Sequence, residues 1–135
     1  MSSQTIMLKL SSNPRNVSLV ESFVEKVVQR YKLSPDKYGD ILISLTEAVN
    51  NAIIHGNQAD ESKSVQIQCS KRSDAISFSV SDEGLGFDPR NIPDPTAPEN
   101  LLKVGGRGVF LMKQLSDELR FSNNGTTVEM RFRLA

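Results

Sequence analysis

Apolar and polar residues alternate along several short stretches of this chain, and a period of two is typical of strands with one buried face. In the last stretch Val128, Met130 and Phe132 fall on one side and the residues between them on the other. The pattern predicts strands over residues 5–10, 65–69, 76–80 and 127–134, and a short strand over residues 119–121. Turn-forming residues at 73–74 and 123–125 predict a hairpin between the second and third strands and a tight turn before the last.

Other stretches carry apolar residues at helical spacing and predict helices over about residues 14–32, 35–55 and from 106 onward. A proline behind a capping-type residue opens each of the first two, and Gly56 ends the second. The helices do not alternate regularly with the strands. We therefore expect an α+β two-layer sandwich, in which a mixed, mostly antiparallel sheet carries its helices on one face.

Length and charge narrow the class of protein. A chain of 135 residues is expected to form a single domain over residues 1–135. Its 16 basic and 16 acidic residues balance, which argues against direct contact with nucleic acid or an anionic membrane. No apolar run is long enough to span a bilayer and no signal-peptide pattern is present, so we expect a cytoplasmic protein. The single cysteine, Cys69, excludes an internal disulfide, and its alternating context favours packing.

The second predicted helix has two faces of different chemistry. A stripe expected to face the core consists of Ile41, Leu45, Ala48, Val49 and Ala52. Glu47, Asn51 and His55 follow one another at i, i+4 and i+8 on another face, with Ile43 and Ile54 beside Glu47. A carboxylate among isoleucines suits a cleft wall and a general base, and an amide oxygen suits Mg²⁺. The alternatives are ordinary surface residues and a His55 that merely caps the helix end.

Asp82 follows the apolar strand at residues 76–80 and precedes Gly84 and Gly86. A carboxylate at the end of a strand can accept a hydrogen bond from an exocyclic amine such as that of adenine, and the glycines let the backbone approach a ligand. The hydroxyl of Thr126 could reach the same acid or the edge of the base. The alternatives are a simple turn at Asp82 and an ordinary strand start at Thr126.

Residues 84–105 contain four of the six prolines and little periodicity, so we expect a functional lid loop there. Gly105, Gly106 and Gly108 stand where the third helix begins. Free backbone N–H groups and the helix dipole would make this helix start a phosphate site, to which Arg107 would add positive charge. The alternative is a flexible hinge for the loop, and the two roles are compatible.

These segments together resemble the ATP-binding boxes of the GHKL ATPases, which have the Bergerat fold, over residues 5–134. The matching residues are Glu47-x-x-x-Asn51, Asp82-x-Gly84-x-Gly86, Gly106-x-Gly108 and Gly125-Thr126. Residues 46–56 and 110–118 are most similar to helices of the bacterial anti-sigma-factor serine kinases. Histidine kinases share the boxes but carry a phospho-accepting histidine on a separate helix, whereas the single histidine here, His55, lies inside a box.

The resemblance implies an ATP-dependent protein-serine/threonine kinase that acts as an anti-sigma, partner-switch regulator. Asn51 would hold Mg²⁺ on the ATP phosphates, and Glu47 would accept the proton of a partner's serine hydroxyl. Asp82 would read adenine with help from Thr126, and the glycines of the boxes would line the nucleotide. The implied partners are a sigma factor and a small STAS-type anti-anti-sigma protein, and the family often forms homodimers.

The chain departs from the family pattern in two places. The arginine that often precedes the second glycine box is replaced by the sequence Leu102-Lys103-Val104-Gly105, so Lys103 or Arg107 would have to contact the γ-phosphate. The basic residue of the first helix that often touches the sigma factor has only Arg15 and Arg30 as candidates.

Two other functions fit parts of the pattern. A nucleotide-gated protein-binding module would hold ATP or ADP without phosphotransfer; the presence of Glu47 argues against it, and the missing lid arginine argues for it. An ATP domain that works beside other domains in a phosphorelay is disfavoured by the length of the chain.

Overall fold

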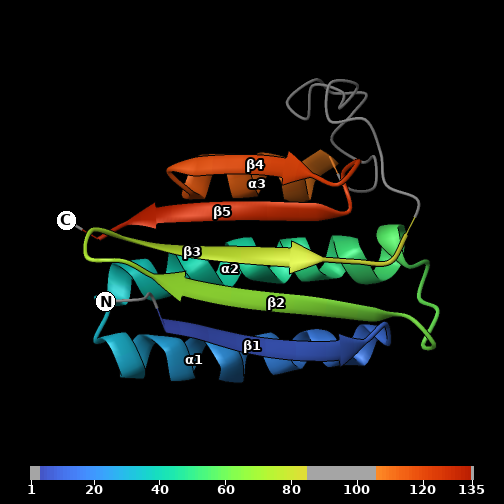
Figure 1. The fold of residues 1–135 in the computed structure, drawn as a ribbon, viewed down its shortest axis with the longest axis horizontal. Helices are drawn as coiled ribbons and strands as arrows, with labels where there is room; N and C mark the ends of the chain where they lie inside the picture. Colours follow the sequence, from blue (N-terminus) through green and yellow to red (C-terminus); the bar gives the residue numbers. More distant parts are fainter. Residues whose placement is uncertain (1–3, 85–105, 135) are drawn as a thin grey trace.

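The computed structural model of the chain describes residues 4–84 and 106–134. Its order is β1 (Gln4–Ser11), α1 (Leu19–Tyr31), α2 (Pro35–Asn51), β2 (Ser64–Lys71), β3 (Ala75–Ser81), α3 (Gly106–Leu115), β4 (Glu118–Ser122) and β5 (Thr127–Arg133). Figure 1 shows the strands as one sheet with α1, α2 and α3 packed behind it. The two-layer α+β architecture predicted from the sequence is thus confirmed.

The sheet has the strand order β1-β2-β3-β5-β4, and every pairing among the described strands is antiparallel. The parallel pair that a mixed sheet would include is therefore not found in these parts of the chain. The register places Ser64 opposite Ser11, Gln66 opposite Ser81, and Ser81 opposite Thr127. One end of the sheet thus brings together the end of β1, the start of β2, the end of β3 and the start of β5.

The core lies between the sheet and the helices. The predicted apolar stripe of α2 is buried, as are the inward residues of β2, β3 and β5. At the centre, the rings of Phe78 and Phe132 meet edge to face with their centroids 6.1 Å apart, an arrangement that aromatic pairs favour. In the described parts of the chain, no helix is both long and apolar enough to cross a membrane.

Two helix ends differ from the sequence prediction. The first helix begins with a 3-10 turn, η1 (Pro14–Ser18), which is capped by the Asn13 side chain, whose oxygen accepts a hydrogen bond from the Arg15 N–H at 2.9 Å. The second leaves α-helical geometry after Asn51 and ends in a π turn, η2 (Ala52–Gly56), in which the Asn57 N–H donates to the Ala52 carbonyl at 2.8 Å. π turns are often found at functional sites.

Cys69 is fully buried in β2, which confirms its predicted packing role. Burial raises the pKa of its thiol to about 12. Because the thiolate is the reactive form, we expect Cys69 to resist a thiol reagent such as DTNB at pH 8 in the folded chain and to react fully in denaturant. Rapid reaction without denaturant would contradict the buried position. Absorbance of the released thionitrobenzoate measures both rates.

Candidate functional site

Asp82 lies at the end of the sheet where β3 meets β5, as its position after an apolar strand predicted. Its backbone N–H donates to the Thr126 carbonyl at 2.9 Å, and its Oδ1 accepts a hydrogen bond from the Gly84 N–H at 2.8 Å. Burial raises the pKa of the Asp82 carboxyl, while the Gly84 hydrogen bond and the positive charge of Lys63 oppose that shift. The chain thus holds a partly desolvated carboxylate in a fixed orientation.

The π turn η2, which follows α2, reaches this acid through a glycine. A Cβ added at Gly56 would overlap the carboxyl group of Asp82, and one added at Gly84 would overlap the carbonyl group of Gly56. Since any side chain here would meet backbone or the acid itself, glycine permits the close approach of the π turn to the Asp82–Gly84 turn. Sequence reasoning assigned Gly56 only to the end of the helix, and its contact with Asp82 is an addition.

This close approach predicts a stability difference between two glycine substitutions. Gly84→Ala should destabilise the fold by about 1–3 kcal/mol, because the new methyl group can be placed only by displacing backbone. Gly39→Ala, in the second turn of α2 with nothing within 4 Å of the added Cβ, should stabilise it by about 0.5–1 kcal/mol. Urea unfolding of the two variants and the parent measures both values, and equal stability of Gly84→Ala and the parent would contradict the packing.

A second group of polar atoms lies where α3 begins against α2. Glu47 and Asn51 are both half-buried on α2. A Cβ added at Gly108, in the first turn of α3, would stand 2.9 Å from Glu47 Oε2 and 3.0 Å from Asn51 Nδ2. A carboxylate, a side-chain amide and the start of a helix therefore meet at one place. The structure thus brings together the first and third of the sequence segments singled out above.

The remaining predicted residues divide into three groups. Gly106 is the first residue of α3 and Arg107 is exposed beside it. The Thr126 hydroxyl donates to the Asn123 carbonyl at 2.8 Å, so it is used within the turn before β5, while its backbone carbonyl contacts Asp82. The lid loop predicted over residues 84–105 lies outside the described residues from position 85 on. This part of the chain includes Gly86, Lys103 and Gly105.

His55 is exposed on the π turn, one residue before Gly56. Partial burial lowers the pKa of its imidazole, which favours the neutral form near pH 7. Of the two isoleucines predicted to flank Glu47, Ile43 is 45% exposed and Ile54 is half-buried. The Glu47 carboxylate was expected to be flanked by apolar side chains on both sides, but on the side of Ile43 this surface is exposed to solvent.

The donor atoms indicate what kind of metal ion could be held here. Among the residues that the structure describes, no cluster of three or more His, Cys, Asp or Glu side chains could form a site of its own. An amide oxygen from Asn51 is a ligand suited to Mg²⁺, an ion that commonly takes one or two protein oxygens and completes its shell with phosphates and water. The Asn51 amide therefore fits Mg²⁺ held jointly with a nucleotide.

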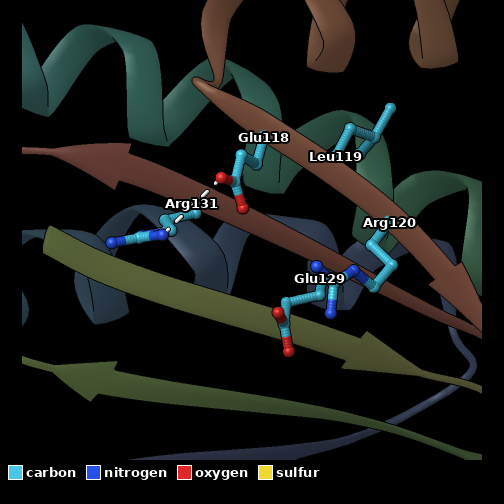
Figure 2. Close-up of a pocket in the computed structure, with 5 residues that line it drawn as sticks. All are labelled: Glu118, Leu119, Arg120, Glu129 and Arg131. Carbon is cyan, nitrogen blue, oxygen red and sulfur yellow. Dashed lines mark ion pairs between the residues drawn. The ribbon is translucent and has the colours of Figure 1, made fainter.

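A hollow of about 240 Å³ lies elsewhere, against β4 and β5. Figure 2 shows its lining from β4 and β5, which consists of Glu118, Leu119, Arg120, Glu129 and Arg131. Arg131 forms an ion pair with Glu118 at 3.6 Å. Opposite charges across neighbouring strands stabilise a sheet, and charged side chains protect an edge strand such as β4 from further pairing. Among the residues that the structure describes, none of those predicted for the nucleotide lines this hollow.

Sequence reasoning missed two residues beside Asp82. Lys63 acts on its carboxyl through charge. Asn57 is buried and hydrogen-bonds to the neighbouring Glu83. An asparagine directly after a helix-ending glycine is a common signal for a turn, so the sequence gives no sign that this side chain is internal.

An antiparallel sheet covered on one face by helices, with an acid at its end and a helix start against an acid–amide pair, defines the class of GHKL-type ATPase domains. Residues 10–132 match the family described as histidine kinase-like ATPase domain. The chain belongs to this family, which confirms the resemblance noted in the sequence.

Curated relatives match most of the chain. The serine-protein kinase RsbW of Bacillus subtilis (strain 168) is 31% identical, with 93% of this chain and 82% of the relative covered. RsbW of Bacillus licheniformis is 30% identical with the same coverage. The anti-sigma F factor of Clostridium perfringens (strain SM101 / Type A) is 30% identical, with 92% of each chain covered.

Proposed function

We propose that this chain is an ATP-dependent protein-serine/threonine kinase that acts as an anti-sigma, partner-switch regulator and phosphorylates a small STAS-type antagonist protein. Its kinase class follows from its family and from relatives named serine-protein kinase. The observation that carries the mechanism is the packing of Gly108, at the start of α3, against Glu47 and Asn51. That packing supports a site in which phosphates, a metal-holding amide and a base act together.

The nucleotide would lie between the end of the sheet and the start of α3. Asp82 would accept a hydrogen bond from the exocyclic amine of adenine, in an orientation fixed by Gly84 and beside the backbone of Thr126. The free N–H groups of Gly106, Arg107 and Gly108 would face the phosphates, because a helix start binds anions through its N–H groups and its dipole. A nucleotide-binding role for Gly86, Lys103 and Gly105 is supported by the sequence resemblance alone.

Phosphoryl transfer would use the two side chains of α2. Asn51 would hold Mg²⁺, which when bound neutralises charge on the phosphates. Glu47 would accept the proton of the attacking serine hydroxyl. A bond forms between the serine oxygen and the γ-phosphorus, the bond from that phosphorus to the β–γ bridging oxygen breaks, and ADP leaves. Positioning and charge stabilisation supply most of the rate enhancement in such reactions.

The proposed partners are proteins. The relatives include a protein named anti-sigma F factor, which supports a sigma factor as the protein released by the switch. Arg15 on η1 and Arg30 on α1 are exposed and remain the candidate contacts for it. A homodimer, which is common in the family, belongs to the same proposal.

The test is a transfer assay with γ-labelled ATP, Mg²⁺ and a STAS-type protein from the same organism. We expect label on one serine of that protein, identified by mass spectrometry, and none on a variant with alanine at that serine. Binding of ATP without label on any STAS-type partner would favour the nucleotide-gated binding module instead.

A further inference from the structure

Asn57 directly follows the π turn, and its side chain is fully buried. Its amide joins segments that are far apart in the chain. Nδ2 donates to Ser12 Oγ at 2.7 Å and to the Ser64 carbonyl at 3.0 Å, while Oδ1 accepts from the Glu83 backbone N–H at 2.7 Å. Both N–H groups and the oxygen of the amide are therefore used.

Through Glu83, this amide fixes the turn that carries Asp82. The Glu83 backbone is held by Asn57, and the Glu83 carboxylate accepts a hydrogen bond from the Ser64 N–H at the start of β2. On its other side, Asp82 is bonded to the start of β5 through the Thr126 carbonyl. The Asp82–Glu83–Gly84 turn is thus held by hydrogen bonds on both sides, and the bond to Asn57 is the one made by a buried side chain.

Asn57 also fixes the π turn against the acid. Its own N–H closes that turn on the Ala52 carbonyl at 2.8 Å, and the preceding residue, Gly56, lies against the Asp82 carboxyl. Ser12, which accepts a hydrogen bond from Asn57, extends the network, because its Oγ donates to the Lys63 carbonyl at 2.8 Å. Asn57 therefore contacts both the π turn η2, through its backbone N–H, and the turn of Asp82, through its side-chain amide.

We propose that Asn57 is a positioning residue of the nucleotide site, whose Oδ1 holds the Asp82–Glu83–Gly84 turn so that Asp82 faces the adenine base. This inference rests on the proposed function, in which Asp82 reads adenine. Asn57 hydrogen-bonds to the segment of Asp82, while the transfer residues Glu47 and Asn51 lie earlier, on α2. Its loss therefore weakens base recognition first.

If Asn57 had a purely structural role, its loss would affect the nucleotide no more than the loss of any other member of the network. Removing any bond of a buried network lowers the free energy of unfolding. Three variants separate the two roles. Asn57→Ala removes all side-chain bonds of the amide, and Asn57→Asp keeps an acceptor for the Glu83 N–H but loses both donors. Ser12→Ala is the matched control, since it breaks the network on the far side and leaves the Glu83 bond in place.

Calorimetry with ADP and GDP in Mg²⁺, together with urea unfolding of each variant, makes the comparison. We expect the unsubstituted chain to prefer ADP, and Asn57→Ala to bind ADP about tenfold more weakly with a smaller preference over GDP. Ser12→Ala should lose stability yet keep both affinities within about twofold, and Asn57→Asp should keep the preference for ADP. If Asn57→Ala does not fold, Asn57→Ser takes its place.

Unchanged affinity and preference in Asn57→Ala, or an equal loss of preference in Ser12→Ala, would overturn the positioning role and leave the proposed function standing. Failure of the unsubstituted chain to bind ADP would overturn both.

Discussion

Replacing Glu47 with glutamine is expected to slow phosphoryl transfer to the partner serine by about 10²–10⁴-fold, the usual contribution of a general base. The glutamine keeps the shape of the side chain beside Gly108 but cannot take up the hydroxyl proton. Affinity for ADP should stay within about threefold of the parent, because the nucleotide is held chiefly by other groups. Single-turnover transfer at saturating ATP, with calorimetry for ADP, gives both quantities.

Asn50→Ala is the matched control for this variant. Asn50 lies on the same helix three residues from Glu47 and is exposed, so its removal should leave the transfer rate nearly unchanged. An unchanged rate in Glu47→Gln would remove Glu47 from the mechanism, and an equal slowing in both variants would assign the effect to the helix as a whole.

Replacing Asp82 with asparagine is expected to weaken ATP and ADP binding by about 10–100-fold, the value of a hydrogen bond to a charged group. The asparagine can still accept the Gly84 hydrogen bond but presents a neutral group to the exocyclic amine. The preference for adenine over guanine should fall in parallel. Competition between ADP and GDP measures it, and an unchanged preference would show that another group reads the base.

The same substitution should alter stability in a pH-dependent way. Burial raises the pKa of the Asp82 carboxyl, so the folded chain binds a proton there more readily than the unfolded chain does. Ionisation of this carboxyl therefore lowers the free energy of unfolding. The decrease begins as the pH rises above the pKa in the unfolded chain, about 3.9, and is complete above the pKa in the folded chain. Asp82→Asn should therefore be at least as stable as the parent at pH 7, with the gap closing towards pH 4. Urea unfolding at several pH values tests the sign.

Much of this fold follows from local pattern. The alternation along β1, β2, β3 and β5 depends on burial of one face, and the spacing of apolar residues along α2 separates its core stripe from the face of Glu47 and Asn51. The turn at Asn123–Gly125, whose residues all have positive φ, follows from asparagine and glycine, which tolerate that backbone. Such features involve residues within a few positions of one another, so the sequence alone predicts them.

The features that escaped prediction depend on distant partners. Asn57 is bonded to residues 45 positions before it and 26 after it, and no local pattern marks a buried amide. The backbone of Gly56, in the π turn, lies against Asp82 and Gly84, which follow β3 and are more than 20 positions away in the chain. The sequence identified the segments of the candidate site, while the contacts that set their relative positions came only from the structure.

Calorimetric titration of the purified chain with ADP and ATP, with and without Mg²⁺, tests the central claim most directly. The arrangement of Asp82, Asn51 and the start of α3 predicts binding of both nucleotides, strengthened by Mg²⁺ and weakened about 10–100-fold by the Asp82→Asn substitution. Absence of binding to either nucleotide in the presence of Mg²⁺ would contradict the proposed site and with it the kinase mechanism.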